Sequence, residues 1–254
     1  MSRHRLPGVR RVVAVASGKG GVGKTTVTAH LGLALGATHR VGIFDADIYG
    51  PNIPTIFGVR SQTRGENWLP MARRDATPYL NPIVRSGVKI MSLGLLIPEG
   101  RAARPDPRFI GQLGLQTVKD VRWGELDYLL LDLPPGTGEP QRTLLEGLEI
   151  DGFIIVTTAS SLALADAERE VDWLSREGGT VLGVVDNMSE TRCPACGASV
   201  RLFEGSVADS PVLGTLPLAQ SLPWATDLNG VAGQDSSPPA RLKPLADWLV
   251  ARLP

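Results

Sequence analysis

A glycine-rich stretch near the start of the chain has the residue types and the spacing of a phosphate-binding loop. The loop fits the pattern G-x-x-x-x-G-K-[ST] and comprises Gly18, Lys19, Gly20, Gly21, Val22, Gly23, Lys24 and Thr25. Because glycine lacks a Cβ atom, successive backbone N–H groups can turn toward an anion. The Lys24 ammonium would contact the β- and γ-phosphates, and the Thr25 hydroxyl would ligate Mg²⁺. We therefore predict that residues 18–25 and the adjacent Thr26 bind a nucleoside triphosphate, taken to be ATP.

A second lysine, Lys19, directly follows the first glycine of this loop. The resulting stretch G-K-G-G-V-G-K-T resembles the deviant phosphate loop of the MinD, ParA and nitrogenase iron protein class. In that class the extra lysine reaches the nucleotide held by the partner subunit, so the resemblance implies a catalytic role for Lys19 across a dimer. A solvated lysine on a loop is the alternative, which the spacing alone leaves open.

Two further segments place carboxylates where a nucleotide-bound Mg²⁺ would need them. Asp45 and Asp47 follow the apolar run 41–44, and Asp132 closes the apolar run 128–131. The C-terminal ends of parallel strands face the ligand crevice of an open α/β sheet. Asp132 is thus the predicted Walker B carboxylate, and Asp45 or Asp47 would order water near the metal or the γ-phosphate. The alternative for Asp45 and Asp47 is an ordinary turn that they cap.

These assignments give two sets of candidate residues. The candidate Mg²⁺ ligands are Thr25, Asp45 and Asp132. The candidate catalytic residues are Lys19, Lys24, Asp45, Asp47 and Asp132.

Two more segments extend the predicted nucleotide site. The proline- and glycine-rich loop 133–138 directly follows Asp132 and could hold two conformations as the γ-phosphate comes and goes, which would make it a nucleotide switch. Without Asp132 a plain strand-to-helix turn would be the better interpretation. Asn187 follows a predicted strand, and its amide could pair with a base edge. On its own such an asparagine is more often a turn residue.

The two cysteines of the chain, Cys193 and Cys196, lie in a single C-P-x-C-G segment. A disulfide scaffold would use more cysteines at wider spacing. The segment therefore indicates a thiolate site.

Apolar runs typical of strands alternate with helical patterns along the chain. They predict the elements that would position these residues. We expect strands near residues 11–16, 41–44, 88–93, 128–132, 153–157 and 181–185, and helices near 25–37, 107–121, 139–148, 162–177 and 239–254. This order predicts an α/β fold of the P-loop NTPase type, a mostly parallel central sheet with helices on both faces. Residues 1–254 would form one ATPase domain, with a disordered basic end at 1–10, a CxxC loop at 190–205 and irregular segments at 61–82 and 229–239.

The composition of the chain argues against several classes of protein. The 254 residues carry 26 basic and 26 acidic side chains, so the formal net charge of zero argues against a nucleic-acid-binding protein. No apolar stretch is long enough to span a bilayer, and no apolar segment of a secretory signal follows the basic start. We therefore expect a soluble cytoplasmic protein that binds neither nucleic acid nor membrane.

Five motifs in fixed order give a closer resemblance. They are V-A-S-G-K-G-G-V-G-K-T-T, F-D-A-D-I-Y-G-P-N-I-P, D-L-P-P-G-T-G-E, V-V-D-N-M-S and C-P-A-C-G, between about residues 12 and 217. With them the chain resembles the Mrp/ApbC family, P-loop ATPases that carry iron–sulfur clusters to apoproteins. The resemblance implies a trans-acting Lys19, switch and Walker B carboxylates at Asp45, Asp47 and Asp132, and a base contact at Asn187. It also implies that Cys193 and Cys196 ligate the cluster.

The ligand count suggests a dimer. A [4Fe–4S] cluster or a tetrahedral zinc ion needs four ligands, and one chain offers two thiolates with no histidine nearby in sequence. Two chains related by a twofold axis would offer four, so we expect a homodimer bridged by the cluster, with apo iron–sulfur proteins as recipients. Zinc in place of the cluster, a redox dithiol and half of a zinc knuckle are the alternatives.

Two other functions stay open at this point. A MinD/ParA-like positioning ATPase would bind a membrane or DNA, and the leucines Leu242, Leu245, Leu249 and Leu253 could form a membrane-surface helix for it. Such a stripe more often packs the last helix on the sheet. A scaffold that binds nucleotide but hardly turns it over is the other possibility, since the ATPase itself is expected to be slow.

Overall fold

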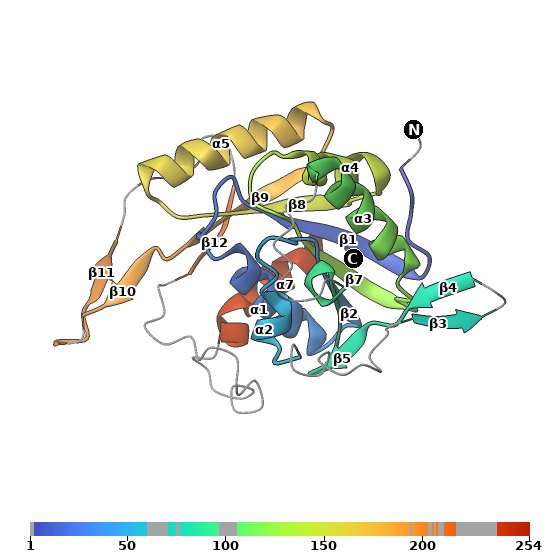
Figure 1. Cartoon of the computed structure of the whole chain (residues 1–254). Coiled ribbons are helices and arrows are strands. Elements are labelled where there is room, and N and C mark those ends of the chain that lie inside the picture. The colour runs from blue at the N-terminus through green and yellow to red at the C-terminus, as the bar shows by residue number, and fades with distance from the viewer. Residues whose placement is uncertain are drawn as a thin grey trace.

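An eight-stranded sheet runs through the centre of the molecule (Figure 1). The computed structural model describes residues 3–59, 71–74, 77–96, 106–193, 195–202, 205, 207, 211–216 and 238–254. The strand order is β12-β9-β8-β1-β7-β2-β6-β5. The strands are β1 (Val9–Ala16), β2 (Val41–Asp45), β5 (Ile83–Arg85), β6 (Val88–Ser92), β7 (Leu126–Asp132), β8 (Gly152–Thr157), β9 (Val181–Asn187) and β12 (Val212–Leu216). Neighbours pair in parallel except β5 and β6, which are antiparallel.

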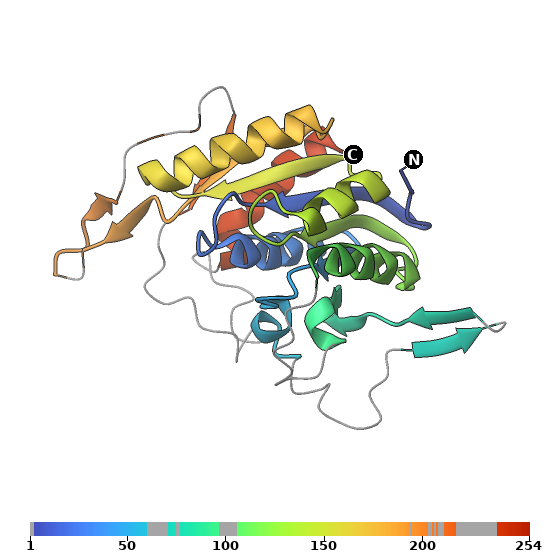
Figure 2. The same ribbon diagram turned by 45° about the horizontal axis from the view of Figure 1, so that its top comes forward.

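Helices cover both faces of this sheet (Figure 2). One face carries α3 (Pro107–Asp120), α4 (Glu139–Gly147) and α5 (Ser161–Arg176). The other face carries α1 (Lys24–Gly36), α2 (Ile53–Ile56) and α7 (Pro238–Arg252). A short 3₁₀ helix, η2 (Leu93–Leu95), follows β6. Each face has its own cluster of buried apolar side chains, so the sheet is sandwiched between two cores and the predicted fold class is confirmed.

The central strands form because they are apolar on both faces. Every residue of β2 and β8 is buried, as are the last five residues of β1 and of β7. A strand with both faces covered reads as a continuous apolar run, and β-branched and leucine-rich runs of this kind gave the sequence signal. In the parallel register of β2 and β7, Asp45 lies directly opposite Asp132. The sheet therefore brings two of the predicted carboxylates to the same edge.

Two hairpins project from the sheet, and the sequence pattern did not predict either of them. The strands β3 (Met71–Arg74) and β4 (Thr77–Leu80) pair antiparallel as a separate two-stranded sheet. The strands β10 (Glu190–Arg192) and β11 (Ser199–Arg201) pair antiparallel within the expected CxxC loop. Figure 1 shows them at opposite ends of the molecule. The remainder of the irregular segments 61–82 and 229–239 lies mostly outside the described residues.

The predicted disorder of residues 1–10 is wrong for residues 3–10. The backbone N–H of His4 donates to the carbonyl of Gly147 at 2.9 Å, and its own carbonyl accepts from Glu149 N at 3.0 Å. Leu6 is 3% exposed and belongs to one of the two cores. Backbone pairing and an apolar anchor therefore order this segment despite its arginines, and Met1 and Ser2 lie outside the described residues.

The last helix packs on the sheet, as the commoner of its two interpretations predicted. Leu242, Leu245 and Leu249 are at most 3% exposed and lie in the core that α7 shares with α1. The apolar stripe of α7 is therefore occupied by the protein's own core. Among the described helices, none combines the length and the apolar character that crossing a bilayer requires.

Candidate nucleotide site and cysteine hairpin

The glycine-rich loop connects β1 to α1 at the C-terminal edge of the sheet. Gly23, the residue before the first turn of α1, has φ +87°, a left-handed conformation that favours glycine. A Cβ atom on Gly18 would lie 2.2 Å from the carbonyl oxygen of Asp166 in α5. These two positions require glycine, and Gly21, with φ +83°, also favours it, whereas a Cβ at Gly20 would meet no atom within 4 Å. The loop is thus fixed at both ends and open in its middle.

Asp132 is the centre of the site. Its carboxylate is fully buried and accepts hydrogen bonds from the hydroxyls of Thr25 at 2.7 Å and Thr28 at 2.8 Å. The Lys24 ammonium lies 2.8 Å from the same carboxylate and is 6% exposed. The structure therefore brings the adjacent lysine and threonine together with the predicted Walker B aspartate, which lies more than 100 residues away in sequence.

Thr28 is a member of this cluster that the sequence interpretation missed. It lies three residues after Thr25 on α1, and residues at that spacing share one face of a helix. That spacing from a predicted metal-binding threonine was an available signal. Its hydroxyl contacts both the Asp132 carboxylate and the carbonyl of Lys24.

Asp45 and Asp47 organise the segment that follows β2. Asp45 accepts from the Ser92 hydroxyl at 3.1 Å and from the backbone N–H groups of Asp47 and Ile53. Burial raises the pKa of Asp45, and the negative charge of Asp132 raises it further, while the Lys24 ammonium opposes both effects. Asp47 accepts from two backbone N–H groups of its own turn. In this structure Asp47 therefore makes the contacts that the turn-capping interpretation predicts.

The residues present fit a magnesium-bound nucleotide. Hydroxyl and carboxylate oxygens, here those of Thr25 and Asp132, are the ligand type that Mg²⁺ takes in proteins. An ammonium and a glycine-bounded run of backbone N–H groups at the start of a helix are the corresponding phosphate ligands. The donor set on each side thus matches the group that it would hold.

The predicted switch loop is hydrogen-bonded to Ser17, the residue between β1 and the glycine-rich loop. Gly136, with φ +82°, donates through its N–H to the Ser17 carbonyl at 2.8 Å. Pro134 O accepts from the buried amide of Gln141 in α4 at 2.9 Å. A movement of residues 17–24 would therefore directly displace residues 133–138.

Asn187 contacts the glycine-rich loop through its side chain. It is 8% exposed, and its Nδ2 donates to the carbonyl of Val22 at 2.8 Å. The contact with a nucleotide base stays a prediction. Lys19 is exposed at the tip of the same loop, as its predicted reach into a second subunit would need.

Cys193 and Cys196 lie in the turn between β10 and β11. Both thiols are free; Cys193 is half-buried and Cys196 is exposed. The Cys193 N–H donates to the Ala198 carbonyl at 2.9 Å, and Gly197 N donates back to Cys193 O at 2.8 Å, so the turn is closed. The backbone N–H groups of Cys196 and Ala195, and then the Cys196 side chain, lower the pKa of Cys193. Hydrogen bonding thus favours the thiolate, the form that binds metal.

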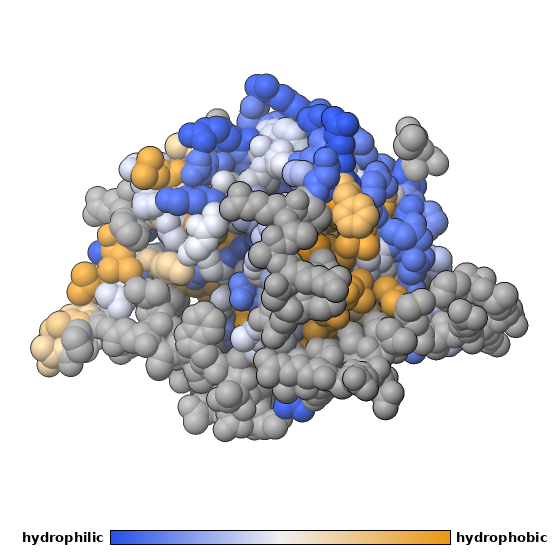
Figure 3. Space-filling view, viewed as in Figure 1, coloured by the Kyte–Doolittle hydropathy of each residue, from blue (hydrophilic) through white to orange (hydrophobic). Residues whose placement is uncertain are grey.

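The two thiols of one chain do not complete a four-ligand metal site with other described residues. Within the described ranges no three His, Cys, Asp or Glu side chains gather closely enough to hold a metal ion. The space-filling view shows apolar colour over the projecting hairpin, where Val200 is 46% exposed (Figure 3). The cysteine turn therefore lies on a surface with two thiolates and apolar neighbours.

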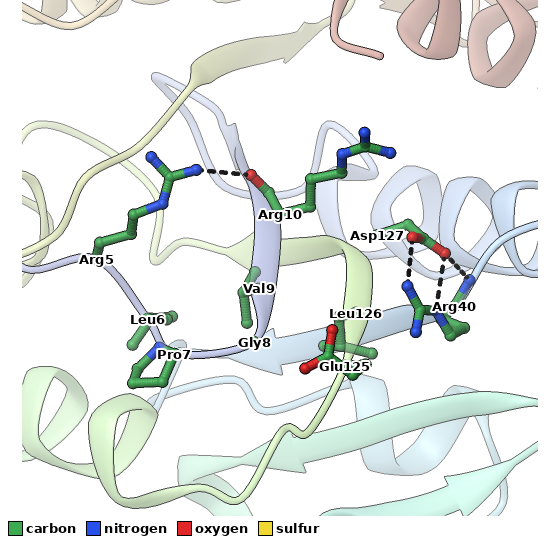
Figure 4. A pocket seen from close by; sticks show the side chains of 10 residues that line it. All are labelled: Arg5, Leu6, Pro7, Gly8, Val9, Arg10, Arg40, Glu125, Leu126 and Asp127. Carbon is green, nitrogen blue, oxygen red and sulfur yellow. Dashed lines mark hydrogen bonds and ion pairs between the residues drawn. The ribbon is translucent and has the colours of Figure 1, made fainter.

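A cavity of about 470 Å³ lies far from this chemistry, where β1 and β7 begin (Figure 4). Its charged lining is largely neutralised, because Arg40 and Asp127 form a bidentate pair with a shortest contact of 2.8 Å and Arg5 lies 3.7 Å from Glu149. The glycine-rich loop and the carboxylates all lie at the opposite ends of these strands. This cavity is therefore not part of the nucleotide site.

Comparison with known proteins agrees with this arrangement. Residues 8–243 match the family described as ParA: NUBPL iron-transfer P-loop NTPase. An iron–sulfur cluster carrier protein of Aquifex aeolicus is 36% identical over 231 residues, which are 85% of this chain and 60% of that protein. Another, from Pseudomonas fragi, is 41% identical over 226 residues, 85% of this chain and 76% of that protein. The chain thus spans three fifths of the length of the Aquifex relative.

Solved structures show the same fold. A nucleotide-binding protein from Archaeoglobus fulgidus in complex with ADP superposes with a TM-score of 0.68 at 31% identity, covering 95% of this chain and 89% of that one. The family match covers nearly the whole chain. The fold and the contact of the glycine-rich loop with Asp132 both agree with it. The chain belongs to the ParA/NUBPL family of iron-transfer P-loop NTPases.

Proposed function

We propose that this chain is a slow, Mg²⁺-dependent ATPase that carries an iron–sulfur cluster and transfers it to apoproteins. The observation that carries the proposal is the pair of free thiols at the turn of β10 and β11, which directly follow the strand whose Asn187 contacts the glycine-rich loop. The similar proteins of A. aeolicus and P. fragi bear the name iron–sulfur cluster carrier, which supports the same assignment.

The cluster would be shared between two copies of the chain. A [4Fe–4S] cluster takes four thiolate ligands, and each copy supplies Cys193 and Cys196. A twofold axis through the cluster would complete the ligand set and cover the exposed apolar surface of both hairpins. The cluster is cargo in this scheme, and zinc would compete for the same four thiolates in an aerobic preparation.

Hydrolysis would use the cluster of polar side chains around Asp132. Lys24 now pairs with Asp132, so phosphate binding would draw its ammonium toward the glycine-rich loop. Thr25 and Asp132 would hold Mg²⁺, which neutralises charge on the β- and γ-phosphates. Asp45 and Asp47, at the end of β2, would order the attacking water, and Lys19 would reach the nucleotide of the partner copy. Water attacks the γ-phosphorus, the bond to the bridging oxygen breaks, and ADP and phosphate leave.

The alternative, a positioning ATPase that binds a membrane, drew its best sequence support from the leucines of α7. Leu242, Leu245 and Leu249 are buried in the core, so these three leucines are not free to contact a bilayer. The cysteine hairpin would also have no task in such a protein.

Anaerobic reconstitution with iron and sulfide tests the proposal. We expect a brown protein that elutes as a dimer, with equal iron and labile sulfide, and that restores the activity of an apo iron–sulfur protein. Cys193→Ala and Cys196→Ala should each abolish the colour. Ala195→Ser, in the same turn with both thiols intact, is the matched control and should load normally. Colour retained in both cysteine variants would contradict a role for these thiols.

A further inference from the structure

The end of β9 is attached both to the glycine-rich loop and to the cysteine hairpin. On one side, Asn187 Nδ2 donates to the Val22 carbonyl at 2.8 Å. On the other, Ser189 O accepts from Leu202 N at 2.9 Å, just beyond the last residue of β11. Ser189 N is itself held by the Leu216 carbonyl at 3.0 Å. Three consecutive residues thus connect the phosphate site to the base of the hairpin.

Met188, between these two attachments, has φ +58°. A non-glycine residue in the left-handed region persists only where its surroundings hold it there, and such positions concentrate at switches and binding sites. Here the surroundings are the hydrogen bonds of Asn187 and Ser189. A change in either attachment would release or reinforce the turn.

Asp186, the residue before Asn187, faces a cavity of about 130 Å³ between β9 and the segments that follow the hairpin. It is 8% exposed, and its Oδ1 has no hydrogen-bond partner within the described part of the chain. Arg201, the last residue of β11, lines the same cavity. Burial raises the pKa of Asp186, and the charge of Arg201 and then a hydrogen bond with the backbone of Ala159 oppose that effect. The two side chains form no ion pair among the contacts of the described residues.

The rest of the cavity lining is almost entirely apolar. Leu164, Val184, Val207 and Val212 contribute to it, together with Thr157 and Gly205. A carboxylate oxygen left without a donor in such surroundings costs free energy, and Asp186 Oδ1 is in that position. A guanidinium that entered the cavity would remove that cost. The structure thus contains an acceptor and a cation with space between them.

We propose that Asp186 and Arg201 form a latch that couples the nucleotide site to the cysteine hairpin. In the closed state Arg201 enters the cavity and pairs with Asp186, which draws β11 and the cysteine turn toward β9. In the open state, seen here, Arg201 and Asp186 are not paired. Because Asn187 is bonded to the glycine-rich loop, a nucleotide that moves Val22 shifts the balance between the two states. The role in cluster release rests on the proposed function, whereas the coupling itself does not.

The reactivity of the two thiols in cluster-free, reduced protein measures this coupling without any cargo. The rate of their reaction with 5,5′-dithiobis(2-nitrobenzoate) is compared with and without a saturating non-hydrolysable ATP analogue and Mg²⁺. In the unmodified chain we expect the rate to change by about fivefold or more, the lower end of ordinary coupling between sites. Asp186→Asn and Arg201→Gln should each reduce that change to less than about twofold.

Three variants complete the design. The double variant Asp186→Asn/Arg201→Gln should behave like either single variant, because the two groups act as one pair. Arg201→Lys keeps the positive charge and should retain most of the nucleotide effect. Asp172→Asn removes a carboxylate on the exposed face of α5, whose side chain is 57% exposed, and should match the unmodified chain. Titration with the analogue confirms that each variant is folded and saturated.

Each result has one consequence. A nucleotide effect in the unmodified chain that disappears in both single variants supports the latch. No nucleotide effect in the unmodified chain, or an effect that persists in both variants, overturns it. Reconstitution of the unmodified chain with iron and sulfide is run in parallel, so that failure to bind a cluster counts against the proposed function and leaves the coupling result intact.

Discussion

Gly23 and Asn187 lie so close that a Cβ atom on Gly23 would be 2.2 Å from Asn187 Nδ2. The glycine at the start of α1 is thus required twice, by its left-handed φ of +87° and by this side chain from β9. The two residues are also linked through Val22, whose carbonyl accepts the Asn187 amide at 2.8 Å. Strand β9 therefore supports the glycine-rich loop from one side. Substitutions at this contact should distinguish the effect of that support from the effect of the loop's own residues.

Gly23→Ala should lower the free energy of unfolding by about 1 to 3 kcal/mol, because the new Cβ strains the backbone and displaces Asn187. Nucleotide affinity should fall with it, since the displaced loop no longer presents its N–H groups together. Denaturant unfolding and ADP titration measure the two effects. Gly20→Ala is the control, since its Cβ would meet no atom within 4 Å, and its free energy of unfolding should stay close to that of the unmodified chain. Equal losses in the two variants would contradict the argument.

Thr28→Val should lower the free energy of unfolding by about 1 to 3 kcal/mol, the cost of taking a donor from a buried carboxylate. The Thr28 hydroxyl donates to Asp132 at 2.8 Å, and valine keeps the shape of the side chain without that donor. The change should also weaken Mg²⁺-dependent nucleotide binding, because Asp132 loses one of the groups that orient it. Thr38→Val, whose exposed hydroxyl contacts His39, is the matched control and should have almost no effect.

The sequence predicted the parts of the fold and of the site that depend on local pattern. The apolar runs predicted β1, β2, β7 and β8, and the motif spacing indicated that Lys24, Thr25 and Asp132 would meet, because doubly covered parallel strands end at one edge. Their roles in binding and hydrolysis stay predictions. It did not predict the hairpins or the antiparallel β5, which are short and lack a clear period. The contact of Asn187 with Val22 spans 165 residues and depends on strand order, which no local pattern encodes.

Glu170 should make stability depend on pH. It lies fully buried on α5, and neither of its carboxyl oxygens has a hydrogen-bond donor within the described part of the chain. Burial raises the pKa of Glu170 to about 7, although the nearby Gln141 side chain acts to lower it. Because the folded state favours the neutral acid, its contribution is complete below the unfolded pKa of about 4.5 and is lost as pH rises through about 7. The loss should be about 3 kcal/mol at most.

Glu170→Gln removes this titration, so the difference in free energy of unfolding between variant and unmodified chain should shift in favour of the variant from pH 5 to pH 8, on the order of 3 kcal/mol or less. Taking the difference cancels the opposite effect of His30, whose pKa burial lowers to about 4. Urea unfolding at several pH values measures it. Glu168→Gln, exposed on the same helix, should show no such slope relative to the unmodified chain. A flat difference for Glu170→Gln would mean that this carboxyl is hydrated in solution.

Lys19→Ala should leave ADP affinity nearly unchanged and lower the ATPase rate by on the order of 10²-fold, the usual cost of removing one group that stabilises transition-state charge. Lys19 is exposed in the glycine-rich loop, whereas Lys24 is bound to Asp132 within the same chain, so of these two lysines Lys19 is the one free to reach a second copy. The ATPase rate per chain should also rise with protein concentration as dimers form.

Mixing Lys19→Ala with Lys24→Ala subunits should restore part of the activity, because one intact nucleotide site then meets one intact Lys19. Lys243→Ala, which removes an exposed cation paired with Asp247 on α7, should behave like the unmodified chain. Normal turnover in Lys19→Ala would place this lysine outside the reaction and return it to the solvated-loop interpretation.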